Sequence, residues 1–168
     1  MFRNRWRSTI ETYGYDLVQL NHYAVRSAES FLVKRDRGRV NHVDRDQGLA
    51  YWFRMNNNFE EETSILKRLP MMKEELAKLM SDPEIAAAHE HSVKCHRAKI
   101  DELKATENYS KFYVELTGAR QEKLARLHGH FGSNVFLSGP AVVPDEVVEK
   151  DPDEEWFFTV ELTGETAH

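Results

Sequence analysis

Four side chains near the start of the chain have the chemistry to handle a phosphorylated ligand. His22 carries an imidazole, which is a common metal ligand, and Arg26, Lys34 and Arg37 carry positive charges. An arginine binds phosphate through two parallel donors, whereas a lysine acts as a point charge. The spacing also fits a structural role, in which His22 is hydrogen-bonded at a strand end and the three cations are surface charges of a helix.

A strand that leads into a helix is expected to position these groups. Residues 17–20 form a short apolar run typical of a buried strand, and the side chains of 21–23 follow where such a strand reaches a cleft. Ser27 can cap a helix through the free backbone amides, and Gly38 can close that helix in a left-handed conformation. Enzymes with α/β folds commonly place ligand-binding groups at such a junction.

The same stretch strongly resembles the segment that ends the catalytic domain of a group of bacterial family 2 type glycosyltransferases. Their pattern is a strand, Asn-His-Tyr, a basic residue and a serine, a helix with Phe-Leu-x-Lys, and then Arg-Gly. The matching positions are Asn21, His22, Tyr23, Arg26, Ser27, Phe31, Leu32, Lys34, Arg37 and Gly38. The likeness covers roughly residues 1 to 115, and residues 17–42 are its specific part.

This resemblance implies a GT-A type α/β domain with a nucleotide-sugar as donor and a glycan or a lipid-linked molecule as acceptor. It implies that His22 helps to hold a divalent cation, Mn²⁺ or Mg²⁺, which neutralises the leaving diphosphate. Arg26, Lys34 and Arg37 are then the candidate diphosphate-binding residues. The expected function is glycosyl transfer, for which the sequence indicates no catalytic base.

Only sixteen residues precede the predicted strand, whereas a GT-A domain needs several βα units of about 30 residues each. We therefore expect a carboxyl-terminal part of such an enzyme, truncated, separately encoded or repurposed, and inactive alone. The alternative is a non-catalytic helical module, derived from such an enzyme, that mediates interaction or oligomerisation. An exposed edge of strand 17–23 would favour a homodimer or a separate catalytic partner.

The composition is that of a soluble globular protein. The 168 residues, 40% of them hydrophobic, suffice for one compact domain and a tail. No stretch approaches the roughly 20 apolar residues of a transmembrane segment, and the first residues lack the apolar centre of a secretory signal. Since the single cysteine, Cys95, fits a reducing compartment, we expect a cytoplasmic location.

The formal net charge of −5 is unevenly distributed along the chain. Residues 1–54 contain ten Lys and Arg against six Asp and Glu, a net charge of +4, and the remaining residues carry −9. A basic zone can attract nucleotide-sugar phosphates, an anionic glycan or an anionic membrane surface, or it can be balanced by acidic neighbours. The pI of 5.9 and the lack of a groove-reading motif predict no nucleic-acid partner.

Two further sets of potential metal ligands are interpreted as structural. The Asp-Arg-Asp sequence at 44–46 matches the aspartate pair of these enzymes, but it follows the Asn-His-Tyr segment, whereas the enzymes' pair precedes it. A predicted helix carries His89, His91, Cys95 and His96. A pair of such residues four apart can begin a zinc site, but a closed site needs about four ligands and no second pair has ligand spacing.

Hydrophobic periodicity predicts a mainly α fold with minor β: a strand–helix remnant of a GT-A domain, a helical bundle, and a short β or irregular acidic tail. Helices are expected over 47–55, from Pro70 through Leu79, over 84–104, and from 108 to 127 with a break allowed at Gly118. The expected buried positions of helix 84–104 are Ile85, Ala88, Val93, Ile100 and Leu103.

Three regions follow from this pattern. Residues 1–55 are assigned to the remnant of the catalytic domain and residues 56–132 to a helical region. Residues 133–168 are assigned to an acidic β or irregular extension, in which short apolar runs separated by prolines predict a β-hairpin or an acidic tail.

Overall fold

A computed structural model describes residues 22–38 and 47–162, and most of these residues are helical. In chain order the elements are α1 (Ala28–Arg37), α2 (Leu49–Met55), η1 (Ser64–Arg68), α3 (Leu69–Met80), α4 (Pro83–Lys104), α5 (Glu107–Thr117), α6 (Ala119–Arg126), η2 (His128–His130), α7 (Ser133–Ser138), η3 (Pro140–Val142) and α8 (Asp145–Val148). The mainly α prediction is confirmed. The predicted strand at 17–20 lies outside the described residues, and His22 and Tyr23 are not in a strand.

Helix α1 begins and ends at the predicted residues. The Ser27 side chain accepts a hydrogen bond from the Ser30 backbone N–H at 3.2 Å, which satisfies one free amide of the first turn. At the other end Gly38 has a φ of +71°, and its N–H donates to the Arg35 carbonyl. This positive φ favours glycine because it lacks a Cβ atom.

A first hydrophobic cluster holds α1 against α2, α4 and α5. Phe31 and Leu32 of α1 are completely buried in it. The other buried members are Ala28, Tyr51, Trp52, Leu103, Phe112 and Leu116. Helix α1 is therefore held in place by three other helices, α2, α4 and α5.

A second cluster joins α2 to the C-terminal third of the chain. Its buried members are Phe53, Leu124, Leu127, Phe131, Val135, Val143, Val147 and Val148. Helix α2 contributes to both clusters, because its adjacent side chains Trp52 and Phe53 enter different ones.

The predicted β-hairpin after residue 135 is wrong for the described residues. Short helices α7 and α8 form there, and the only β pairing in the described ranges is an isolated parallel bridge between Phe131 and Phe158. The apolar runs that suggested strands belong to the second cluster, in which Val135 and Val143 are completely buried. The segment after α8 is irregular, and its Phe158 and Val160 pack against that cluster.

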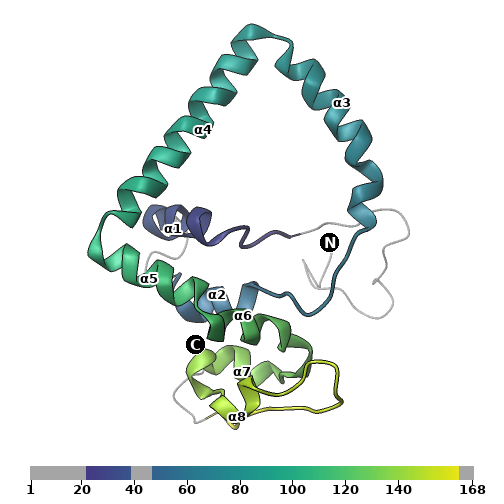
Figure 1. Cartoon of the computed structure of the whole chain (residues 1–168), viewed down its shortest axis with the longest axis vertical. Helices are drawn as coiled ribbons and strands as arrows, with labels where there is room; N and C mark the ends of the chain where they lie inside the picture. The colour runs from purple at the N-terminus through teal and green to yellow at the C-terminus, as the bar shows by residue number, and fades with distance from the viewer. Residues whose placement is uncertain (1–21, 39–46, 163–168) are drawn as a thin grey trace, which may run out of the picture.

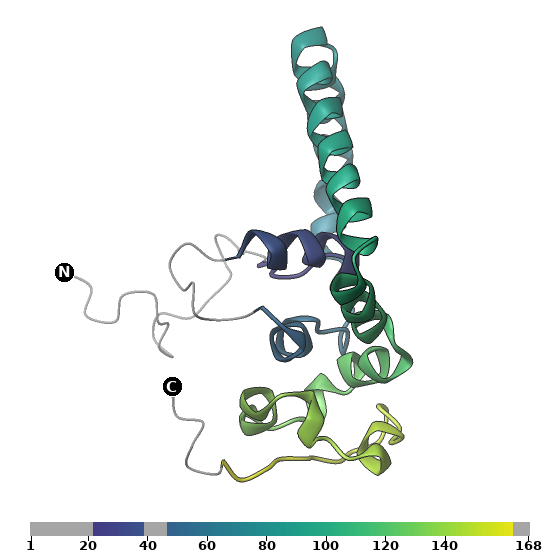
Figure 2. The ribbon, with the colours of Figure 1, turned by 90° about the vertical axis from the view of Figure 1, so that its left-hand side faces the viewer.

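Helices α3 and α4 form two long arms that meet at a turn after Met80 (Figure 1). Asp82 caps α4 by accepting from the Glu84 and Ile85 backbone amides. Viewed from the side, the arms rise away from the other helices (Figure 2). Despite the 22 residues of α4, no helix in the described ranges combines the length and apolarity needed to cross a membrane.

The predicted buried face of α4 is only partly correct. Leu103 is buried and Ile100 is half-buried, because this end of α4 packs against α1 and α5. Ile85 and Ala88 are exposed instead, since they lie near the tip of the arm. The periodicity of an apolar stripe identifies a face that favours contact, but burial also needs a packing partner.

Candidate functional site

Three of the predicted site residues surround one hollow beside α1. The hollow has a volume of about 360 Å³ and is lined by ten residues: Tyr23, Ala24, Val25, Arg26, Ser30, Phe31, Val33, Lys34, Arg37 and His96. Its lining residues come from the segment that enters α1, from α1 and from α4. Helix α4 packs beside α1 (Figure 1). Its volume is at the lower end of the range of about 300–1,000 Å³ found for small-molecule sites.

Helical geometry explains why these residues meet. Ser30, Lys34 and Arg37 are spaced four and three residues apart, so they project from one face of α1. Arg26 is four residues before Ser30, in the segment that leads to the cap at Ser27. The structure thus places Arg26, Lys34 and Arg37 around one hollow.

Lys34 combines a structural role with its place at the hollow. Its ammonium group donates to the Ala24 carbonyl at 2.5 Å and to the Tyr51 hydroxyl at 3.0 Å. These bonds tie the entry segment and α2 to α1. Because an ammonium group has three N–H donors, one remains for a ligand.

The two acidic residues of α1 have partners on other helices. Tyr113 donates its hydroxyl to Glu29 at 2.6 Å, and this hydrogen bond is the main cause that lowers the pKa of Glu29. Asp36 pairs with Lys99 at 3.2 Å and accepts from Tyr109. No Asp or Glu occurs among the described residues that line the hollow, which therefore presents an excess of positive charge.

The same contacts raise the pKa values of the two tyrosines. The Glu29 carboxylate accepts a hydrogen bond from the Tyr113 hydroxyl and so raises the pKa of Tyr113. Burial, followed by the negative charge of Asp36, raises the pKa of Tyr109. Both tyrosines accordingly stay protonated and act as donors that hold α5 against α1.

His96 of α4 is a lining residue that sequence reasoning did not assign to this site. Its Nε2 lies 3.2 Å from the Ser30 Oγ, a contact between residues 66 positions apart. The available signal was its spacing of four and seven residues from Ile100 and Leu103, which places it on the face of α4 that packs inward. The imidazole adds a polar side chain from α4 to the hollow.

The structure places His22 outside the set of lining residues, with an exposed side chain. Among the described residues, no group of three or more His, Cys, Asp or Glu side chains is arranged to hold a metal ion. The Asp-Arg-Asp sequence lies outside the described ranges. His22 therefore does not fit a divalent-cation site together with any described ligand, and its metal role stays a prediction.

The histidines of α4 separate into different environments. His91 and Cys95 share a face, as predicted from their spacing, with Nε2 and Sγ 3.4 Å apart. His96 projects toward Ser30 instead. The four potential zinc ligands of this helix thus do not converge.

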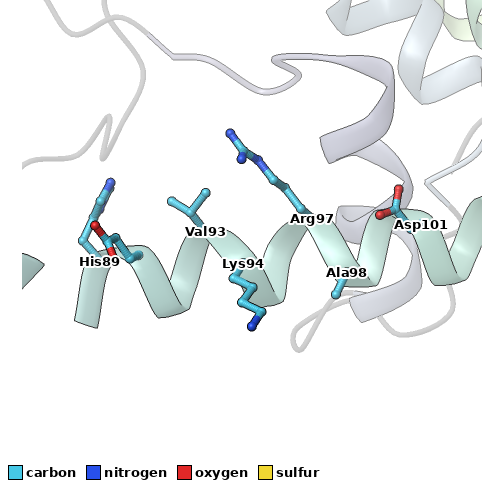
Figure 3. Close-up of a pocket in the computed structure, with 7 residues that line it drawn as sticks. His89, Val93, Lys94, Arg97, Ala98 and Asp101 are labelled. Atoms are coloured by element: carbon cyan, nitrogen blue, oxygen red, sulfur yellow. The ribbon is translucent and has the colours of Figure 1, made fainter. Parts of the chain in front are cut away.

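A larger hollow, of about 530 Å³, has lining residues from α4 alone. Its side chains leave the helix in different directions, as Arg97 and Lys94 show (Figure 3). A single exposed helix face gives a ligand little enclosure, whereas ligand sites are usually concave and formed by several elements. We therefore regard the hollow beside α1 as the candidate functional site.

No family model, curated protein or solved structure matches this chain. The functional assignment accordingly depends on the geometry of the hollow and on the resemblance of residues 21–38.

Proposed function

We propose that this chain takes part in sugar-nucleotide-dependent glycosyl transfer and that the hollow beside α1 binds the diphosphate of the donor. The observation that carries the proposal is the convergence of Arg26, Lys34 and Arg37 on one hollow that has no lining carboxylate. These are also the basic positions of the segment that resembles family 2 type glycosyltransferases.

The three cations have two tasks in this proposal. Arg26 and Arg37 are exposed and each presents a guanidinium fork, which matches two oxygens of a phosphate. Lys34 is held in place by Ala24 and Tyr51 and has one further N–H for the ligand. Transfer of a sugar leaves negative charge on the diphosphate, so fixed cations that contact it stabilise the transition state.

Calorimetric titration of the full chain with UDP-glucose and with UDP tests this binding. We expect both to bind with similar affinity, because they share the nucleoside and the diphosphate. Arg26→Ala and Arg37→Ala should each weaken binding about tenfold, since a hydrogen bond to a charged group contributes about 1.5 kcal/mol or more. Lys67→Ala, an exposed change on η1, is the matched control and should leave binding unchanged.

Inorganic pyrophosphate separates a nucleotide-sugar site from a general anion site. If pyrophosphate binds as tightly as UDP-glucose, the hollow recognises charge alone and the glycosyl-transfer proposal is wrong. Absence of any UDP binding by the unmodified chain would also contradict it and would favour the non-catalytic helical module. Weaker binding of pyrophosphate, with loss of UDP binding in the Arg26 and Arg37 variants, supports it.

A further inference from the structure

Helix α3 carries an unpartnered row of apolar side chains along its length. Leu69, Met72, Leu76 and Leu79 are spaced three, four and three residues apart, which places them on one face. About half of the surface of Met72, Leu76 and Leu79 is exposed, at 49%, 47% and 52%. Such a row is a coiled-coil seam, with Leu69 and Leu76 at a positions and Met72 and Leu79 at d positions.

The position of α3 in the fold leaves this row accessible. Among the described elements α3 makes its main contacts with η1, which precedes it, and with α4. Figure 1 shows α3 as an arm that diverges from α4 beyond their shared turn. No residue of α3 is buried.

We propose that a second copy of this chain covers the row, with α3 of the two copies packed antiparallel around a twofold axis. In the heptad given by the apolar row, Arg68 and Glu75 both occupy g positions and Lys73 occupies an e position. In an antiparallel pair g faces g, so Arg68 of each copy lies opposite Glu75 of the other. A parallel pair would instead place Arg68 opposite Lys73, which are like charges.

The charges beside the row favour a protein occupant over an anionic membrane because they are of both signs. Glu75 borders the row together with Arg68 and Lys73, and the exposed Glu60, Glu61 and Glu62 precede η1. An anionic lipid surface would attract the two cations but repel the carboxylates. A second α3 pairs Glu75 with an arginine and covers the apolar side chains in the same step.

The expected association is modest. Twelve residues of helix are about 18 Å long, so the seam has few layers and the dimer should dissociate on dilution. This inference does not depend on the anion-binding hollow, whose residues lie on α1, its entry segment and α4.

Charge exchange at the g positions tests the pairing. Sedimentation equilibrium of the full chain over increasing concentration should show a monomer–dimer equilibrium. Arg68→Glu or Glu75→Arg alone should weaken the dimer about tenfold, because symmetry turns two attractive pairs into two repulsive ones. The double variant R68E/E75R should restore the affinity of the unmodified chain. Lys67→Glu, at the outward f position, is the matched control and should leave the affinity of the dimer unchanged.

Several outcomes would overturn the proposal. A monomer at every concentration, a dimer that is insensitive to the single exchanges, or a double variant that stays as weak as the single ones each contradicts antiparallel α3 pairing. Binding of a monomeric chain to phosphatidylserine vesicles through α3 would assign the row to a membrane instead. Circular dichroism verifies that the variants keep the helix content of the unmodified chain; because all substituted side chains are exposed, we expect no change.

Discussion

The Lys34 ammonium group has two hydrogen-bond partners among the described residues. Replacement by methionine removes the hydrogen bonds from Lys34 to the Ala24 carbonyl and to the Tyr51 hydroxyl. We expect Lys34→Met to lower the free energy of unfolding by about 1–2 kcal/mol. Arg37→Ala, at an exposed position, should change it by less than about 0.5 kcal/mol. Urea denaturation followed by circular dichroism measures both values.

Equal effects of these two substitutions on stability would contradict the division of tasks in the hollow. Lys34 would then have no positioning role, and all three cations would be equivalent surface charges. The ligand-binding effect of Arg37→Ala, in contrast, should appear without any loss of stability.

Among the described histidines, His128 is the one whose pKa burial lowers strongly. It is 7% exposed, its hydrogen bond is to the Phe53 backbone, and its Nε2 has no partner. Burial disfavours the charged imidazole and lowers the pKa of His128 to about 4, against an ordinary value of 6.5. The folded chain therefore holds His128 neutral over a pH range in which the unfolded chain takes up a proton.

This difference predicts a loss of stability in mild acid. Neutral His128 contributes to the free energy of unfolding, and this contribution is fully present above pH 6.5. It is lost as the pH falls toward 4, because protons then bind the unfolded state preferentially. The loss amounts to about 3 kcal/mol at most. Urea denaturation of the unmodified chain and of His128→Leu, between pH 7 and pH 4, should show a smaller decline for the variant.

His22→Ala is the control for replacement of a histidine elsewhere in the chain. The side chain of His22 is exposed, so this substitution should leave the free energy of unfolding at about pH 7 unchanged. A His128→Leu chain that loses as much stability in acid as the unmodified chain would show that His128 is not the responsible group.

At the scale of elements, Gly129 allows η2 to lie close to Phe59, in the segment that follows α2. A Cβ atom on Gly129 would lie 2.2 Å from the Phe59 ring, which packs edge-on against His130. Gly129→Ala should displace this ring and destabilise the fold by about 1 kcal/mol. In a chain that already carries Phe59→Ala the same substitution should cost much less, which a double-mutant cycle of urea denaturation measures. Equal costs in both backgrounds would disprove the steric explanation.

The sequence predicted most helix boundaries because local residues determine them. Ser27 and Gly38 bound α1, and Pro83 begins α4 after the cap at Asp82. Burial was predicted less well, because it depends on what packs against a helix. Ile85 is exposed because no other described helix covers it near the tip of α4. After Phe131 the chain forms short helices in place of the predicted hairpin, because its apolar side chains pack into the second hydrophobic cluster.

At the scale of the whole molecule, the candidate site combines one local segment with one distant residue. The shared face of Lys34 and Arg37 could be predicted, since the two residues are three apart on α1. The participation of His96 was not, because it depends on α4 returning past the start of α1. The first hydrophobic cluster, which joins Phe31 and Leu32 of α1 to Leu103 of α4, fixes this arrangement.

The central claim is that the hollow beside α1 binds a diphosphate, and the most direct test locates that ligand in the intact chain. Titration of UDP into ¹⁵N-labelled protein, followed by two-dimensional amide NMR, should shift the resonances of residues 24–37 and of His96. Residues of α3 and of α8, none of which lines the hollow, should remain unshifted. Shifts confined to other helices, or no shifts at millimolar UDP, would contradict the account.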